Sequence, residues 1–413
     1  MMLIFDIISI ILLSVLLFWT VYNGSIIYVG VKNRRKQLPS SSSNYGNEEP
    51  KFSIIVPTKD EEVVIGRCLN GLLDLDYPKD KIEIIVVDGN SSDNTCKVCS
   101  DFAAKYPGKF KIINEKQSKG KPAALNLALP YATGEIVGVF DADSVPEKDV
   151  LRKVASYLED KQLMAVQGKT TSLNEKNNIL TRVAAAEEKA WFQALLSGRE
   201  KLQLFVPLNG SCQFIRRNIL EELSGWDETS LTEDVELALR LVEKKHQIKY
   251  AEDVCCGQET PSGLRGFIKQ RVRWYRGYME TAFKYGRLLD TLNRRTVDAE
   301  ISLAGPFMMV VSLLSYVNWF FLALFLAESN PIVSFTGIVI ALTAVSLLSV
   351  GVGLTASEKP LKLRNLLWVP AIYAYWLIQM CIAGWAFLTL IFRRKRIWNK
   401  TVKTGLVIPN VAK

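Results

Sequence analysis

Long apolar runs lie at both ends of the chain and enclose a middle part in which short apolar runs alternate with helical patterns. The run from Leu3 to Val31 is almost wholly apolar and is long enough to cross a bilayer. Three later runs have the same length and character, at 301–327, 331–354 and 366–392. The pattern predicts a transmembrane anchor over 1–31 and about three transmembrane helices within 301–392.

The middle part, residues 51–260, has the pattern of one α/β domain. Its strand-like runs are rich in Ile and Val and lie at 52–57, 82–87, 111–113 and 136–140, with helical patterns between them. This alternation predicts a doubly wound, mostly parallel sheet. Because ligands bind at the carboxyl ends of the strands in such sheets, we expect Asp88 and Asp141, which directly follow two of them, at the binding edge.

Two further stretches are amphipathic. Residues 263–285 combine aromatic and aliphatic side chains with lysine and arginine, a pattern typical of a helix in the headgroup plane. We therefore expect an interfacial segment over 261–300. Residues 178–197 place Val183 and Trp191 near one helical face, and here a packed helix of the globular domain is an equal alternative.

The charge distribution adds an orientation. The net charge is +9, and basic clusters at 32–36 and 393–396 adjoin apolar runs, which favours anionic lipid surfaces. The first cluster predicts an outside N-terminus, with the linker 32–50 and the catalytic domain in the cytosol. Three later spans would leave the basic tail 393–413 outside, against the same rule, unless one segment is re-entrant or interfacial. No basic, aromatic-rich groove motif indicates nucleic-acid binding.

Cysteine and histidine content excludes several kinds of site. The seven cysteines have no regular spacing, which argues against a disulfide framework and favours reduced, cytosolic thiols. Cys96 and Cys99 with Cys255 and Cys256 offer only a weak zinc signal. A single histidine, His246, argues against a Ser-His-Asp triad or a histidine-rich metal site.

The sequence Asp141-Ala142-Asp143 directly follows a predicted buried strand. A turn after the strand would bring both carboxylates toward one ion. Hard oxygen ligands suit Mg²⁺ or Mn²⁺, which also bind phosphates. We therefore expect Asp141 and Asp143 to hold a divalent metal that stabilises a diphosphate leaving group.

A second acidic cluster, Thr232-Glu233-Asp234, precedes a predicted helix over 235–244. These residue types also suit an ordinary helix N-terminus. Transfer to a hydroxyl group requires a carboxylate that accepts the acceptor proton, and Asp234 is our candidate for this general base.

Three other clusters suit anionic or sugar ligands. Gln270-x-x-Arg273-Trp274 combines a planar cation with an aromatic face, although snorkelling arginines on a lipid-facing helix give the same pattern. Lys121 lies beside Gly120 at a predicted helix N-terminus, a favourable anion site. Asn209-Gly210-Ser211 is small and polar enough to let an acceptor approach the backbone.

Taken in order, these clusters resemble the family-2 glycosyltransferases, in particular the membrane-embedded cellulose, chitin, hyaluronan and poly-N-acetylglucosamine synthases. The resemblance covers about residues 51–277. It rests on six motifs: Ile54-Ile55-Val56-Pro57-Thr58 with Glu61, Val86-Val87-Asp88-Gly89 with Ser91-Ser92-Asp93, Gly120-Lys121, Asp141-Ala142-Asp143, Thr232-Glu233-Asp234 and Gln270-x-x-Arg273-Trp274.

The resemblance implies a GT-A fold and an inverting, metal-dependent transfer from a UDP-sugar. It assigns uracil binding to Asp88, nucleotide contact to Asp141, the metal to Asp143 and the base to Asp234. The diphosphate falls to Gln270 and Arg273, and the acceptor sugar to Trp274. Further expected site residues are Pro57, Thr58, Glu61 and Lys121 on the donor side, and Glu233, Asn209, Gly210 and Ser211 on the acceptor side.

Two features depart from the family pattern. Thr58-Lys59-Asp60-Glu61 replaces the usual Tyr-Asn-Glu, and no clear gating-loop motif of cellulose synthases is present near 355–359. The first expectation is a processive synthase that extends a β-linked polysaccharide. The alternative is an enzyme similar to ceramide glucosyltransferases that adds one sugar to a membrane lipid, and the few C-terminal helices favour it. An inactive scaffold is disfavoured because every expected position is filled.

Overall fold

The structure is a computed structural model that describes residues 2–32, 49–286, 293–325, 341, 369–396, 401 and 403–405. The predicted apolar run 331–354 (apart from residue 341) and the stretch 355–359 lie outside the described residues.

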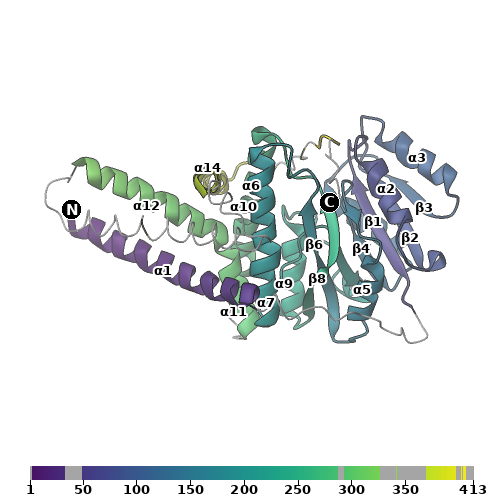
Figure 1. Cartoon of the computed structure of the whole chain (residues 1–413), viewed down its shortest axis with the longest axis horizontal. Helices are drawn as coiled ribbons and strands as arrows, with labels where there is room; N and C mark the ends of the chain where they lie inside the picture. The colour runs from purple at the N-terminus through teal and green to yellow at the C-terminus, as the bar shows by residue number, and fades with distance from the viewer. Residues whose placement is uncertain are drawn as a thin grey trace.

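An eight-stranded mixed sheet forms the centre of the fold, in the order β3-β2-β1-β4-β7-β6-β8-β5 (Figure 1). The first half, β3-β2-β1-β4, is parallel, and β6 and β8 are parallel too, whereas β7 and β5 run antiparallel to their neighbours. The strands are β1 Phe52–Thr58, β2 Ile82–Asp88, β3 Phe110–Asn114, β4 Ile136–Val139, β5 Val145–Pro146, β6 Leu163–Ser172, β7 Gln213–Arg216 and β8 Gln247–Gln258. The predicted α/β class is confirmed, and β5 to β8 are additions to the predicted strands.

Helices cover both faces of the sheet, and the alternation of side chains along β1 explains why. Ile54 and Val56 point into one apolar core, and Ile55 points into the other. The first core includes side chains of α2 Ile65–Leu73, α3 Thr95–Lys105 and α5 Val150–Tyr157. The second includes side chains of α4 Lys121–Ala128, α8 Arg217–Glu222, α9 Glu233–Glu243 and α11 Arg294–Leu303. Short 3₁₀ turns lie at Lys79–Lys81 and Leu129–Tyr131.

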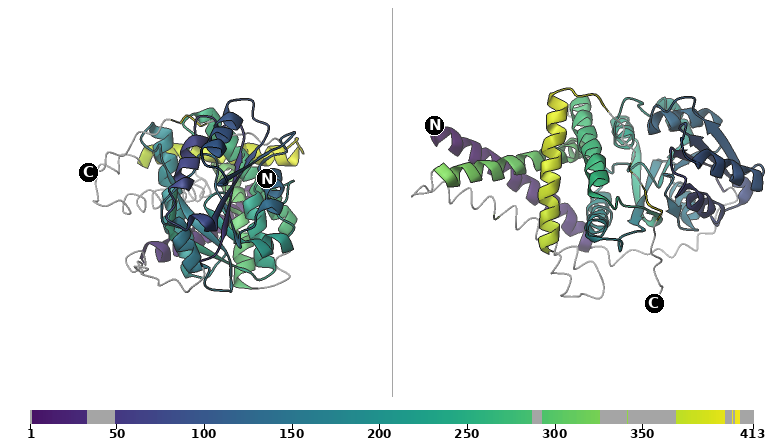
Figure 2. Two further views of the ribbon diagram at one scale, coloured as in Figure 1. Left: turned by 90° about the vertical axis from the view of Figure 1, so that its right-hand side faces the viewer. Right: turned by 90° about the horizontal axis from the view of Figure 1, so that it is seen from above.

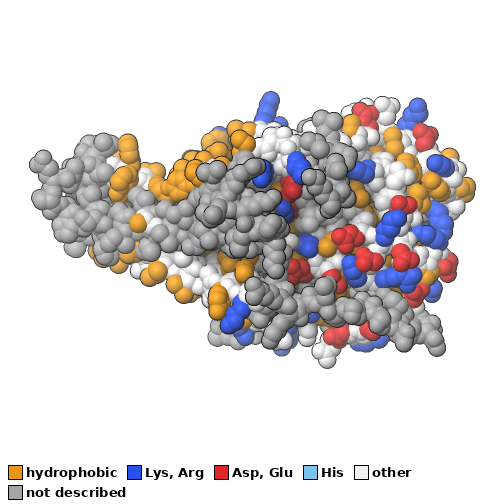
Figure 3. Space-filling view, in the orientation of Figure 1, with side chains coloured by type: hydrophobic (Ala, Val, Ile, Leu, Met, Phe, Trp, Pro, Cys, Tyr) orange, Lys and Arg blue, Asp and Glu red, His pale blue; other side chains and the backbone are white. Residues whose placement is uncertain are grey.

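Long apolar helices extend from one side of this domain. Helices α1 Met2–Lys32 and α12 Gly305–Phe325 project away from the sheet (Figure 1), and α14 Val369–Ile391 runs alongside α10 Leu264–Tyr285 (Figure 2). By length and composition, Ser9–Lys32 and Pro370–Ile391 could each cross a membrane, as could the bent pair of α11 and α12 taken as one span. Charged side chains gather over the sheet domain and apolar ones over the projecting helices (Figure 3).

The segment after β6 joins the sheet domain to the projecting helices. Helix α6 Ile179–Ala190 continues as a π-helix, Trp191–Leu196, and then as α7 Ser197–Lys201. Backbone atoms of α1 approach it closely, since a Cβ added at Gly30 would lie 2.0 Å from the Ala194 carbonyl oxygen and one at Gly198 would lie 2.1 Å from that of Ile26. Only glycine allows this contact, so α1 packs directly on the domain.

Two buried clusters strengthen this junction. A third apolar core contains residues of α6, α10, α12 and α14, so the first half of 178–197 packs against the long apolar helices. Next to it, Arg199 of α7 forms an ion pair with Asp298 of α11, and both side chains are almost fully buried. The Asp298 carboxylate also accepts a hydrogen bond from the Phe205 amide at 2.8 Å.

Candidate functional site

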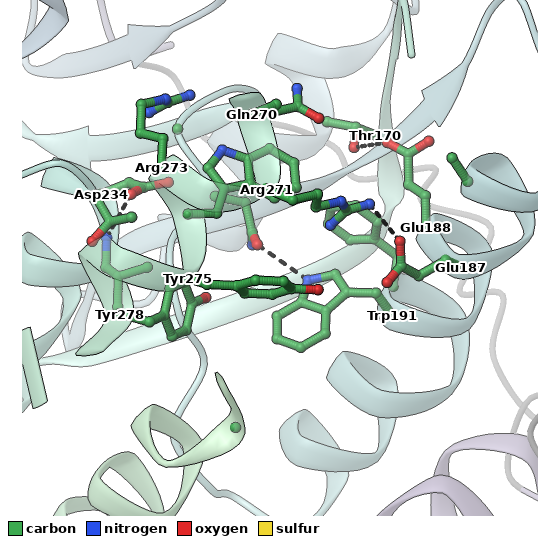
Figure 4. A pocket seen from close by; sticks show the side chains of 18 of the residues that line it. Thr170, Glu187, Glu188, Trp191, Asp234, Gln270, Arg271, Arg273, Tyr275 and Tyr278 are labelled. Atoms are coloured by element: carbon green, nitrogen blue, oxygen red, sulfur yellow. Dashed lines mark hydrogen bonds and ion pairs between the residues drawn. The ribbon is translucent and has the colours of Figure 1, made fainter. Parts of the chain in front are cut away.

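A large cavity of about 1080 Å³ lies between the carboxyl ends of the strands and the projecting helices. Most of the site residues predicted from the sequence line it, and they come from six separate parts of the chain. Figure 4 labels Asp234, Gln270 and Arg273 among them. Those that line it are Pro57, Thr58, Glu61, Lys121, Asp141, Asp143, Asn209, Gly210, Glu233, Asp234, Gln270, Arg273 and Trp274. Asp88 and Ser211 lie behind this wall.

The two aspartates after β4 each pair with a lysine. The Lys121 ammonium lies 2.5 Å from the Asp141 carboxylate and also donates to the Gly210 carbonyl at 2.7 Å. Burial alone would lower the pKa of Lys121, but the charges of Asp141 and Glu233 outweigh it and raise that pKa. Asp143 is almost fully buried and accepts from the Glu259 amide at 2.8 Å and from Lys403 at 2.6 Å.

Lys403 reaches this site from the segment after α14. Its ammonium also donates to the Glu259 carbonyl at 2.7 Å, and the Thr404 amide donates to the Glu259 carboxylate at 3.1 Å. That carboxylate pairs with Arg67 of α2 at 2.6 Å. The residues around 403 therefore close one side of the cavity by a contact between Lys403 and Asp143.

The acidic cluster Thr232-Glu233-Asp234 stands at the start of α9, as predicted. Gly277 of α10 packs on Thr232, since an added Cβ would lie 2.6 Å from the Thr232 methyl group, and this contact positions α10 beside the cluster. Gly210, with φ of +74°, leaves room on the other side, because a Cβ there would lie 3.1 Å from the Asp234 carboxylate. Burial and the neighbouring Glu233 charge raise the pKa of Asp234 to about 7.

Helix α10 carries the predicted Gln270, Arg273 and Trp274 on the cavity side. Arg273 donates to the Leu231 carbonyl at 3.1 Å, just before the acidic cluster. The guanidinium of Arg271 lies 4.6 Å from the centre of the Trp274 ring, so one face of that indole is already covered by a cation. The hydrogen bond from Arg273 to Leu231 joins α10 to the segment just before the acidic cluster.

The ends of β1 and β2 lie side by side, with Thr58 in register with Asp88. Both Asp88 carboxylate oxygens accept hydrogen bonds from Ser91, one from its amide at 3.1 Å and one from its hydroxyl at 2.5 Å. Asp88 thus shapes the turn after β2, and the next residue, Gly89, lines the cavity. The Thr58 hydroxyl is buried and has no partner within the described ranges, so it is available to a ligand.

In the Asn209-Gly210-Ser211 stretch, the first two residues line the cavity, and Ser211 lies behind them. Asn209 accepts from the indole NH of Trp191 at 3.1 Å, and both residues line the cavity. The Ser211 hydroxyl is buried and accepts from the Asp141 amide at 3.2 Å. Ser211 therefore holds the loop that carries the two aspartates and does not face the cavity.

Several lining residues were not predicted as site residues. Lys403 carries no local motif, and its immediate sequence neighbours, Val402 and Thr404, give no signal of a binding site. Glu187 and Glu188 follow a run of three alanines on α6 and look like solvent-facing positions, yet both line the cavity. The signal that could have marked them is the pair of acidic residues on a helix whose other faces are apolar or small.

The cysteines form no metal site. All seven are free, with Cys96 partly exposed on α3 and Cys256 buried on β8. Within the described part of the chain, no group of three or more His, Cys, Asp or Glu side chains is arranged to hold a metal ion unaided. A divalent ion at Asp141 and Asp143 would therefore need ligand atoms from water or from a bound diphosphate.

Comparison with known proteins identifies the family of this domain. A family model described as "Glycosyltransferase like family 2" matches residues 50–277. The probable glycosyltransferase YdaM of Bacillus subtilis is 34% identical over 253 residues, which is 60% of this chain and 60% of YdaM. A β-monoglucosyldiacylglycerol synthase of Trichormus variabilis is 33% identical over 244 residues, 58% of this chain and 51% of that enzyme.

More distant relatives include a poly-β-1,6-N-acetyl-D-glucosamine synthase of Staphylococcus epidermidis, 26% identical over 65% of this chain and 64% of that enzyme. The chain thus spans between half and two-thirds of the length of these relatives. Among solved structures, the mannosyltransferase PcManGT from Pyrobaculum calidifontis, in complex with GDP-Man and Mn²⁺, has a TM-score of 0.67 at 21% identity. It covers 95% of this chain and all of that one, and the likeness confirms the GT-A-type fold. From the family match over more than half of its length, this chain belongs to the family-2 glycosyltransferases.

Proposed function

We propose that this enzyme transfers one sugar from a UDP-sugar, with inversion, to a hydroxyl group of a membrane lipid. The observation that carries the proposal is the extent of the cavity. It begins at Asp141, Asp143 and Asp234 and reaches apolar side chains of the projecting helices. These are Leu16, Trp19 and Ile27 of α1, Met308 and Met309 of α12, and Trp376 and Met380 of α14.

An apolar wall of this kind suits a lipid acceptor. Helices α1 and α14 are apolar enough to lie in a bilayer, so a lipid could enter the cavity laterally and bring its hydroxyl to the carboxylates. The β-monoglucosyldiacylglycerol synthases among the relatives support a lipid acceptor as well.

The bond changes follow from a single displacement. The acceptor oxygen forms a bond to the anomeric carbon, the bond from that carbon to the diphosphate breaks, and UDP leaves. Asp234 takes the acceptor proton, and its raised pKa makes it an effective base near neutral pH. Gln270, Arg273 and Lys121 orient the diphosphate, and Trp274 contacts the acceptor.

A divalent metal fits the pair Asp141 and Asp143. Each of these carboxylates already holds an ammonium group, from Lys121 and Lys403, and carboxylate oxygens are suitable ligands for Mg²⁺ or Mn²⁺. When bound, such an ion would neutralise negative charge on the leaving diphosphate.

Extension of a polysaccharide is the second candidate. Trp191 and Trp274 both line the cavity, and aromatic rings of this kind stack on sugar rings. The poly-N-acetylglucosamine synthases among the relatives support it too. For both candidates we propose that the domain faces the cytosol, because the basic residues 32–36 directly follow α1.

Product length is expected to separate the two candidates. Purified protein in lipid nanodiscs, supplied with radiolabelled UDP-glucose or UDP-N-acetylglucosamine, should form an organic-soluble product that carries one sugar. Thin-layer chromatography and mass spectrometry measure the number of sugars per lipid. A polymer retained at the origin and degraded by a glycosidase would contradict the lipid proposal and support the polysaccharide one.

Removal of divalent metal is expected to stop transfer. Excess chelator should abolish UDP release, and Mn²⁺ or Mg²⁺ added beyond the chelator should restore it. Asp143→Asn should weaken Mn²⁺ binding in the presence of UDP, measured by electron paramagnetic resonance. Glu115→Gln, at another acidic position of the cavity, serves as a control that keeps Mn²⁺ binding. Full turnover in chelator would disprove the metal requirement.

A further inference from the structure

Two adjacent glutamates of α6 line the cavity, and they differ in what binds them. Glu187 is fully engaged: its carboxylate accepts from Gln379 at 2.8 Å, from the Tyr375 hydroxyl at 2.6 Å and from Arg271. This network joins α6, α10 and α14, and it gives Glu187 a structural position. Glu188 is not part of it.

The Glu188 carboxylate has one bound oxygen and one open oxygen. Oε1 accepts from the Thr170 hydroxyl at 2.5 Å and from the Gln258 amide at 3.3 Å. Oε2 is buried and has no hydrogen-bond partner anywhere in the described structure. A buried carboxylate oxygen without a donor is unfavourable, so a donor from a ligand would be bound strongly.

Glu188 lies on the wall of the cavity. Thr170 and Gln258 line the cavity with it, and Gln258 directly precedes Glu259, whose amide binds Asp143. In Figure 4, Glu188 and Thr170 lie on the side opposite Asp234, with Gln270 between them in the view. Glu188 therefore belongs to the part of the cavity wall that also carries Asp143.

The chemistry of this wall position selects the kind of ligand. Burial raises the pKa of Glu188, although the hydrogen bonds from Thr170 and Gln258 oppose the rise. The Glu188 carboxyl group can form a hydrogen bond with a neutral hydroxyl whether it is protonated or ionised. A phosphate would be repelled by the carboxylate. A sugar hydroxyl is the ligand group that fits.

We propose that Glu188, held by Thr170 and Gln258, binds a hydroxyl group of a sugar in the cavity and so determines which sugar the enzyme uses. The inference rests on the proposed glycosyl transfer. The hydroxyl belongs either to the sugar being transferred or to a sugar on the acceptor, and the experiment below distinguishes these sources.

The test measures UDP release, which reports transfer whatever the acceptor is. Wild type and Glu188→Gln are compared with UDP-glucose, UDP-N-acetylglucosamine and their 3-, 4- and 6-deoxy analogues, using octyl β-glucoside and its deoxy analogues as acceptors. We expect Glu188→Gln to lower kcat/KM about 10- to 100-fold with the intact sugars. With the analogue that lacks the recognised hydroxyl, wild type and variant should be nearly equal.

One deoxy analogue should give the same kcat/KM with wild type and with Glu188→Gln. Whether that analogue is a donor or an acceptor shows which sugar carries the recognised hydroxyl. UDP affinity by calorimetry should stay within a few-fold. Glu187→Gln is the matched control. It should lower the melting temperature and change kcat/KM by the same factor with every analogue. If Glu188→Gln folds poorly, Thr170→Val should show the same analogue dependence with a smaller loss.

Three results would overturn the inference: an equal loss with every analogue, no loss at all, or a collapse of UDP binding. An equal loss or no loss would mean that Glu188 only holds β6 and β8 in place. A collapse of UDP binding would mean that it belongs to the nucleotide site. Failure of the proposed function looks different, because wild type itself would then release no UDP with any of these sugars.

Discussion

Asp234→Asn is expected to lower the rate of transfer by about 10²–10⁴-fold while UDP still binds. The amide keeps the size of the side chain and its place at the start of α9, beside Gly210, but it cannot accept the acceptor proton. Calorimetry should give a UDP affinity within a few-fold of wild type. Glu236→Gln, on the same helix but paired with Arg240 at 2.8 Å, is a control that should retain transfer.

The pH dependence of kcat/KM supplies an independent measure of the same role. Asp234 acts as a base only when it is deprotonated, and its pKa of about 7 lies well above the ordinary value. Transfer should therefore rise with pH up to about 7 and level off above it. A profile that stays flat down to pH 5, or a loss of UDP binding in Asp234→Asn, would give Asp234 a structural role instead.

Asp298→Ala is expected to cause the largest loss of stability. The variant leaves the Arg199 guanidinium buried without its partner and removes the acceptor of the Phe205 amide. Breaking a buried pair from one side costs about 3–5 kcal/mol of unfolding free energy. Thermal unfolding in detergent, followed by tryptophan fluorescence, should show a midpoint lower by on the order of 10 °C.

The double variant Arg199→Met/Asp298→Leu separates charge burial from packing. Replacing both charges with apolar groups of similar size should recover most of the lost stability. The exposed pair Lys244 and Glu222 provides a surface comparison, since Glu222→Ala should leave the unfolding midpoint nearly unchanged. Equal stability of Asp298→Ala and wild type would mean that α7 and α11 are held together by apolar contacts alone.

The strands β1, β2 and β4 could be predicted because they are short, mostly buried runs rich in Ile and Val. Asp141 could be predicted because parallel strands present their carboxyl ends at a common edge. The cluster around Asp234 could be predicted because its acidic residues directly precede a helical pattern. Strand β8 is harder to predict from the sequence, because Gln247–Gln258 contains lysine, glutamate and aspartate among its apolar residues. Such a strand shows no clean alternation, and only pairing with β6 over its length defines it.

The remaining parts of the site depend on tertiary contacts. Lys403 and Asp143 are 260 positions apart, and no local pattern joins them. Glu188 stands near the end of α6, which continues as a π-helix. A sequence pattern with the regular helical period of 3.6 residues therefore assigns the side chains beyond α6 to the wrong face. Asp88 and Ser211 match the family motifs, yet in the fold their oxygens bind neighbouring loops.

The contact between Lys403 and Asp143 also has a consequence for biosynthesis. Asp143, Glu259 and Arg67 emerge from the ribosome well before α14, so the sheet domain can fold while α14 is still being made. Lys403 follows α14 in the chain and reaches Asp143 only after that helix has been placed. Until then, Asp143 is a buried carboxylate with a backbone amide as partner and no ammonium group beside it. Placement of α14 and completion of the charged contacts around Asp143 are thereby coupled in time.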